Sequence, residues 1–180
     1  MRILKIIMNK WLLFITLLFF PLTTQALTLN KCIDGDTAKF NDNNTIITVR
    51  FLAIDTPELN TDNQYADIAR NFTCHQLQIA QNIELVKDGN STDTDKYGRK
   101  LRWVFVDNKL LQKELIKNGY AKVAYLYGDY QYIPELKDLE QQAIKNQVGM
   151  WHQPDYDYYY VILTITLILL MLLKKIRKHS

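Results

Sequence analysis

The chain has 180 residues, enough for one compact domain with an extension at each end. Seven of its 22 lysine and arginine residues lie within the first ten and the last seven positions, which leaves 15 cations against 19 anions between them, a net charge of −4. This balance excludes a protein that coats nucleic acid through a broad basic surface. A polyanion would have to be handled at a local site, helped by a bound cation.

Residues 1–26 have the three parts of a secretory signal peptide. The basic segment MRILKIIMNK is followed by the apolar segment WLLFITLLFFPL, and TTQA then offers small residues for cleavage after Ala26. An uncleaved first membrane helix is the alternative. The shortness of the apolar segment and its break at Pro21 favour cleavage.

Residues 27–54 have the pattern of three β-strands. The segments LTLNKCI and TAKF flank Asp34, Gly35 and Asp36, which form a turn signal of hairpin type. A run of polar turn residues over 41–44 then precedes TIITVRFLAI, whose β-branched and aromatic residues predict one long central strand.

The remaining elements follow in the order helix, two strands and two helices. Residues 64–81 repeat apolar side chains at near-helical spacing, and NIELV and LRWVFVD predict two further strands. A helix over 110–118 ends at Gly119, and another opens near Pro134 and continues to Gln147. Five short strands with an inserted helix suit a small closed barrel of the oligonucleotide/oligosaccharide-binding (OB) type. We therefore expect an α+β domain over residues 27–153, a five-stranded OB-fold barrel with three α-helices.

The C-terminal part contains a second apolar segment, YYYVILTITLILLMLL over residues 158–173, followed by the basic tail KKIRKHS. Sixteen helical residues rise about 24 Å, and flanking tyrosine and lysine side chains would extend this toward the roughly 30 Å hydrocarbon core. We expect a transmembrane helix over 158–173 rather than a buried core helix, with residues 174–180 as a cytoplasmic tail. The domain would then be exported to the extracytoplasmic face of the cytoplasmic membrane, or secreted if the tail is removed.

Two cysteines, Cys32 and Cys74, lie in the domain expected to be exported. An oxidising compartment permits a disulfide between them, but nothing in the sequence places them within reach of one another. Two unpaired buried thiols are the alternative, and the choice stays open at this stage. Their spacing matches no metal-binding motif.

Two carboxylates, Asp36 and Asp55, occupy strand ends that converge in such a barrel. Asp36 follows the first hairpin turn, and Asp55 ends the long strand. Together with a backbone carbonyl they form a hard-oxygen set suited to Ca2+. Taken alone, Asp34-Gly35-Asp36 has the composition of an ordinary tight turn, and DTPE could cap a short helix.

Two arginines favour a catalytic site over these structural alternatives. Arg50 has apolar strand neighbours, where a cation is costly unless it is paired or directed at a ligand. An ion pair with Asp36 or Asp55 is its structural alternative. Arg99 follows a glycine turn in TDKYGRKLRW. Two arginines beside a metal stabilise charge on a reacting phosphate, and Glu58 is then the natural base for an attacking water.

The motifs IDGDT, VRFLAIDTPE, TDKYGR, NGYAKVAYLY and GMW occur in this order. Over residues 27–152 the chain resembles the staphylococcal nuclease (thermonuclease) family. The resemblance implies a five-stranded barrel with three helices and Ca2+-dependent hydrolysis of DNA and RNA to 3′-phosphorylated products. Nucleic acid would be the substrate, no protein partner is implied, and a monomer is expected.

The resemblance also assigns roles to ten positions. Those matched to the metal site are the carboxylates Asp36 and Asp55, the backbone carbonyl of Thr56, and the accessory acidic residue Asp34. Those matched to catalysis are the general base Glu58 and the phosphate-binding arginines Arg50 and Arg99. Those matched to contacts with the terminal phosphate and base of a nucleotide are Lys96, Tyr125 and Tyr127. Ordinary packing is the alternative for the two tyrosines, although stacking on a base is common in such barrels.

Two other functions remain to be weighed. A non-catalytic nucleic-acid-binding OB module at the cell envelope is the main alternative, but such modules would be expected to lose the acidic or arginine positions. A structural envelope scaffold would need no arginine pair around carboxylates. The segment over 58–65 is shorter than the basic loop of the best-known secreted family member and lacks lysines, which predicts weaker nonspecific affinity for polyanions.

Overall fold

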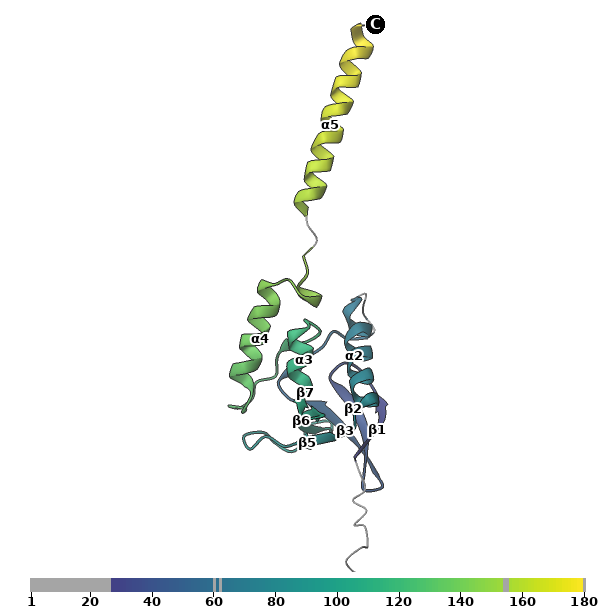
Figure 1. The fold of residues 1–180 in the computed structure, drawn as a ribbon. Coiled ribbons are helices and arrows are strands. Elements are labelled where there is room, and N and C mark those ends of the chain that lie inside the picture. Colours follow the sequence, from purple (N-terminus) through teal and green to yellow (C-terminus); the bar gives the residue numbers. More distant parts are fainter. Residues whose placement is uncertain (1–26, 60, 62, 154–155, 180) are drawn as a thin grey trace, which may run out of the picture.

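A computed structural model describes residues 27–59, 61, 63–153 and 156–179 (Figure 1). The expected signal peptide over residues 1–26 lies outside the described residues. Within the described part, the order of the main elements is three strands, a helix, two strands and two helices. This order and the α+β class are confirmed.

One mixed sheet organises the domain. Its strands are β1 (Thr28–Cys32), β2 (Thr37–Asp42), β3 (Thr45–Phe51), β5 (Ile83–Val86), β6 (Lys100–Val106) and β7 (Lys109–Leu110). The five longer strands pair in the order β1-β2-β3-β6-β5, with β7 beside β6, and the β3–β6 pair is parallel. The short strands β4 (Ile54–Asp55) and β8 (Lys122–Val123) form a separate antiparallel pair. Together with its helices, this mixed sheet fits an OB-like α+β fold.

The helices are α2 (Tyr65–Ile79), α3 (Leu111–Lys117), α4 (Ile133–Lys145), the short 3-10 helix η1 (Gly149–Trp151) and α5 (Tyr156–His179). Two of them cover the sheet, because α2 packs against β1 and α3 packs against β6, while α4 packs against α3 and β8 (Figure 1). Their apolar faces meet the alternating side chains of the strands in one core. Members of this core include Phe40, Phe51, Trp103, Leu115 and Leu136, all of which are fully buried.

The long central strand expected to run to Ile54 is interrupted. β3 ends at Phe51, and the chain turns at Leu52 and Ala53 before β4 begins. Ala53 has a positive φ of 61°, an unusual backbone conformation for a residue with a side chain. The turn redirects the chain toward β8, so Asp55 lies on a different strand pair from Arg50.

The expected membrane helix over residues 158–173 is not supported. α5 forms there, but among the residues that the structure describes no helix is long and apolar enough to cross a membrane. The apolar part of α5 has 16 residues and rises about 24 Å, which is short of a hydrocarbon core of roughly 30 Å. The alternative of a buried core helix is wrong, since Leu163, Leu167 and Leu170 are exposed.

Candidate functional site

The predicted site residues gather around one cavity of about 720 Å³. Nine of the ten line it: Asp34, Asp36, Arg50, Asp55, Glu58, Lys96, Arg99, Tyr125 and Tyr127. They come from the β1–β2 turn, from β3, from β4 and the segment after it, and from the segments before β6 and after β8. The tenth residue, Thr56, is buried directly behind Asp36, with which it forms hydrogen bonds.

Asp36 lies at the base of the site and is only 4 % exposed. The backbone N–H of Thr56 donates to its Oδ2 at 2.8 Å, and the Thr56 hydroxyl donates to the same atom at 3.2 Å. The hydroxyl of Thr37 donates to Oδ1 at 3.1 Å. Burial raises the pKa of the Asp36 carboxyl to about 7, while the nearby charge of Arg50 opposes the shift. Burial thus outweighs the hydrogen bonds and the ion pair, and a bound cation would favour the ionised carboxylate.

Arg50 joins the two predicted metal carboxylates. Its Nε lies 3.1 Å from Asp36 Oδ1, and its second terminal nitrogen lies 3.6 Å from Asp55 Oδ1. The other terminal nitrogen donates to the carbonyl of Phe51 at 2.9 Å. The ion pair considered as a structural alternative is thus present, and it involves both carboxylates. The guanidinium also lies 5.2 Å from the ring centre of Tyr125, which places it at the cavity wall.

Asp55 has a second cationic partner that the sequence reasoning missed. Lys122 on β8 is paired with Asp55 across the β4–β8 register, and its Nζ lies 3.2 Å from Asp55 Oδ2. Lys122 stands in the motif NGYAKVAYLY, but only the pairing of two short, distant strands brings it beside Asp55. The lysine partly neutralises the carboxylate from the exposed side.

Arg99 lines the same cavity, and its ion pair is with Asp95 rather than with the carboxylates that Arg50 joins. The Arg99 Nε lies 2.7 Å from Asp95 Oδ2, while the backbone N–H groups of Tyr97 and Arg99 both donate to Asp95 Oδ1 at 2.9 Å. Burial by itself would raise the pKa of Asp95, but these hydrogen bonds outweigh it and hold the pKa below its ordinary value. Asp95 therefore stays ionised and orients the guanidinium.

Three aromatic residues form the exposed rim of the cavity. Tyr127 is 83 % exposed and Tyr125 is 52 % exposed, so neither ring is buried in the core. Their ring centres are 6.3 Å apart. Tyr97, which the sequence reasoning missed, also lines the cavity, and Lys96 Nζ lies 5.0 Å from its ring centre. Tyr97 lies within the motif TDKYGR, between Lys96 and Arg99, and this position could have indicated that it belongs to the site. Exposed rings beside cations suit a stacked base with its phosphate.

The residues present fit the cation that the resemblance implies. Within the described ranges, no three histidine, cysteine or acidic side chains lie close enough together to hold a metal by themselves. A site here would use Asp36 and Asp55, a backbone carbonyl and water, a pattern of hard oxygen ligands that Ca2+ accepts. The position of Asp36 and Asp55 on the lining of one cavity supports this assignment.

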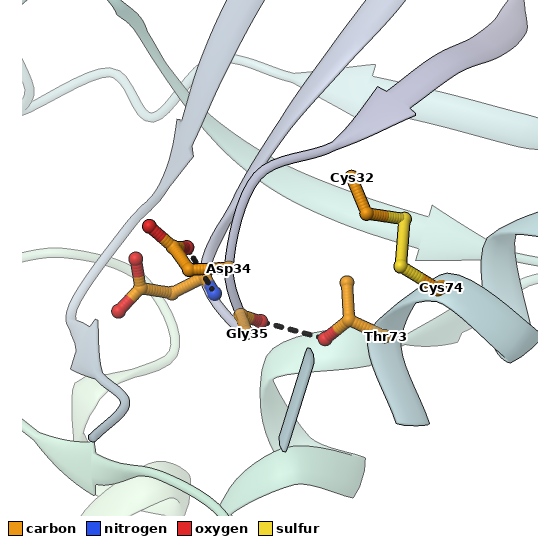
Figure 2. The surroundings of a disulfide bond; sticks show 6 residues. Cys32, Asp34, Gly35, Thr73 and Cys74 are labelled. Carbon is orange, nitrogen blue, oxygen red and sulfur yellow. Dashed lines mark hydrogen bonds between the residues drawn. A yellow bond between two sulfur atoms is a disulfide. The ribbon is translucent and has the colours of Figure 1, made fainter. Parts of the chain in front are cut away.

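The turn that carries Asp34 and Asp36 is tied to α2. Cys32 at the end of β1 and Cys74 on α2 form a disulfide, with their Cα atoms 5.8 Å apart (Figure 2). The question left open by the sequence is thereby answered in favour of a bridge. Cys32 is two residues before Asp34, so the bridge lies beside the site. Only the packing of α2 on β1 brings Cys74 to it.

Comparison with known proteins supplies the last observation on this site. Residues 48–153 match the family model described as "Staphylococcal nuclease homologue". The SPbeta prophage-derived endonuclease YokF of Bacillus subtilis (strain 168) is 37% identical over 132 residues, which cover 72% of this chain and 45% of that protein. Endonuclease YncB of the same strain is 36% identical, with 72% of this chain and 63% of that protein covered. The thermonuclease of Staphylococcus hyicus is 29% identical, with 71% and 76% covered. The chain thus spans less than two thirds of the length of the first two relatives.

Proposed function

Because the chain belongs to the staphylococcal nuclease homologue family, we propose that it is a Ca2+-dependent nuclease that hydrolyses phosphodiester bonds of DNA and RNA. The observation that carries this proposal is the shared cavity. Arg50 joins Asp36 and Asp55 there, and Arg99 and Glu58 line the same space. A binding module without catalysis would not require two arginines together with the carboxylate of Glu58 at the same cavity.

The side chains divide the reaction between them. Bound Ca2+ would supply Lewis-acid polarisation of a phosphate oxygen, held by Asp36, Asp55 and the carbonyl of Thr56. Arg50 and Arg99 donate hydrogen bonds to the phosphate oxygens as negative charge builds up on them. Asp95 holds Arg99 ready for this contact, since it already orients the Nε group.

Glu58 is placed to act as the general base. It is exposed, lines the cavity and follows Pro57 just after β4. It accepts a proton from the attacking water as the new bond to phosphorus forms. The bond between phosphorus and the 5′ oxygen breaks, the leaving oxygen takes up a proton from solvent water, and the phosphate remains on the 3′ oxygen.

The rim residues bind the nucleotide next to the scissile bond. Tyr125 and Tyr127 offer exposed rings for a base, and Lys96 offers a cation for a neighbouring phosphate. Stacking on an aromatic ring tolerates any base, which agrees with action on both DNA and RNA.

We also propose that the domain works outside the reducing cytoplasm. The Cys32–Cys74 disulfide supports this, because structural disulfides persist mainly in exported proteins. The signal-like segment over residues 1–26 points the same way. Fractionation of the producing cells should find the domain outside the cytoplasm, and a wholly cytoplasmic, reduced protein would contradict export.

One assay tests the proposed activity. The full chain is incubated with labelled single-stranded DNA, duplex DNA and RNA in Ca2+, in Mg2+ or in excess chelator. We expect cleavage in Ca2+, none in chelator, and products whose 3′ ends become extendable only after phosphatase treatment. Bound strands without any product in Ca2+ would favour the non-catalytic binding module, and undiminished cleavage in chelator would remove the metal from the proposal.

A further inference from the structure

The turn between β1 and β2 carries Asp34 and Asp36 on either side of Gly35, and it rests against α2. Figure 2 shows the turn, the disulfide and the hydrogen bond that joins the turn to the helix. The hydroxyl of Thr73 donates to the carbonyl of Gly35 at 2.6 Å. Thr73 is fully buried, so water does not compete for this hydrogen bond.

Gly35 approaches the helix so closely that no side chain fits there. A Cβ at this position would lie 2.8 Å from the Cβ of Ala69 and 2.8 Å from Cγ2 of Thr56. Ala69 is fully buried on α2, one helical turn before Thr73. The backbone of the turn therefore lies in close contact with both Ala69 on α2 and Thr56, the residue that donates hydrogen bonds to Asp36.

The disulfide joins α2 to the strand that leads into the turn, three residues before Gly35. Cys32 is the last residue of β1, and Cys74 follows Thr73 on α2. The Thr73 hydrogen bond and the disulfide thus connect α2 to both the turn and the strand that enters it. Two neighbouring attachments prevent the turn from sliding along the helix, which a single contact would allow.

We propose that Thr73 is a positioning residue for the carboxylates Asp34 and Asp36, and that the Cys32–Cys74 disulfide acts with it. Both carboxylates line the cavity and flank the carbonyl that Thr73 holds. This inference rests on the proposed cation site. Thr73 touches neither substrate nor metal, so its effect passes through the backbone of the turn.

The first test compares three threonine variants of the full chain. Thr73→Val removes the hydroxyl at nearly constant volume, and Thr73→Ser retains it. Thr45→Val is the matched control, because the Thr45 hydroxyl also donates to a backbone carbonyl, that of Asp42 at 2.6 Å, in the β2–β3 turn away from the cavity. Ca2+ affinity is measured by isothermal titration calorimetry, and amide exchange is measured by NMR without metal.

We expect Thr73→Val to weaken Ca2+ binding about threefold to tenfold, the effect of one lost hydrogen bond. It should also speed exchange of the Asp36 amide, which donates to Asp34 Oδ1 at 3.0 Å and so reports on the shape of the turn. Thr73→Ser should restore both properties, and Thr45→Val should change neither. Equal results for Thr73→Val and Thr45→Val would overturn the proposal.

A double variant tests the same inference if Thr73→Val does not fold. Cys32→Ala combined with Cys74→Ala removes the bridge, and we expect the same faster exchange of the Asp36 amide with the rest of β2 and β3 unchanged. Exchange that rises evenly over the whole sheet would show a general loss of stability and would overturn the positioning role. The exchange measurement needs no metal, so it stays informative even if the wild-type chain neither binds Ca2+ nor cleaves nucleic acid.

Discussion

Arg50 shows how one buried residue serves both fold and site. It is 8 % exposed between the buried side chains of Val49 and Phe51, and two carboxylates compensate its charge. Such a buried ion pair contributes little net stability, because desolvation of the charges offsets their attraction. The arrangement is better explained by a guanidinium that must face a phosphate at the cavity.

Arg99 is the better target for a mutation that separates activity from folding. Its ion pair is with Asp95, so Arg99→Ala leaves Arg50 between Asp36 and Asp55. We expect nuclease activity to fall by about a thousandfold or more, the usual cost of removing an arginine that stabilises transition-state charge. The melting temperature should remain close to that of the wild type.

The matched control for this variant is Arg70→Ala. Arg70 lies on α2 and does not line the cavity. Its removal should leave cleavage within about twofold of the wild type. If Arg99→Ala keeps a tenth or more of the activity, the guanidinium does not act on the reacting phosphate.

Asp36 should make Ca2+ binding depend on pH. Burial raises the pKa of its carboxyl to about 7, and the cation binds the ionised form, so binding below that pH displaces a proton. The apparent dissociation constant should rise about tenfold per pH unit as the pH falls from about 7 to about 5.5. Calorimetry in two buffers of different ionisation enthalpy would count the released proton, and an affinity that is constant over this range would contradict the assignment.

At the scale of elements, two glycines allow a close backbone contact between the end of α3 and the segment that follows α4. Gly119 ends α3 with a φ of 64°, and Gly149 begins η1 with a φ of 59°. The N–H of Met150 donates to the carbonyl of Gly119 at 2.9 Å. This contact anchors the chain just before β8, the strand whose Lys122 pairs with Asp55.

Gly119→Ala should therefore destabilise the domain by about 2 kcal/mol or more. A Cβ at Gly119 would collide with the carbonyl of Val148, and its positive φ disfavours any side chain. Gly89→Ala is the control, since no atom lies within 4 Å of the Cβ it would add. Urea denaturation should show a lower midpoint for Gly119→Ala only, and equal midpoints would argue against the close contact.

At the scale of the whole molecule, charge limits how the protein meets a polyanion. The part between the terminal basic segments has a net charge of −4, and five carboxylates line the cavity beside Arg50, Lys96 and Arg99. Phosphate contacts are thus concentrated at these three cations. Broad electrostatic attachment to nucleic acid is not expected.

The salt dependence of binding tests this view. Three phosphate contacts on a single strand predict a slope of about −2 in a plot of the logarithm of the binding constant against that of salt concentration. The measurement uses fluorescence anisotropy of a labelled single strand at saturating Ca2+, under conditions of slow cleavage. A slope steeper than about −5 would reveal a wider basic surface.

The element order could be predicted because it follows from local patterns, whereas most of the residues around the cavity were named from motifs that resemble the nuclease family. Apolar periodicity and turn residues placed α2, α3 and α4 to within a few residues. The interruption at Leu52 and Ala53 was missed, because TIITVRFLAI continues a strand pattern and only pairing with β8 ends it. The expected membrane helix is not supported among the residues that the structure describes.

The sequence by itself determined which chemical groups the protein has, namely two carboxylates and an arginine around one strand, a second arginine after a glycine turn, and aromatic positions in the motif NGYAKVAYLY. Only the tertiary structure decided their partners: Arg50 with both carboxylates, Asp55 with Lys122, Arg99 with Asp95, and Cys32 with Cys74. The reason is that residue type and short-range spacing are written along the chain. The pairing of β4 with β8 and the packing of α2 on β1 join residues far apart in sequence, and they arise only when the core forms.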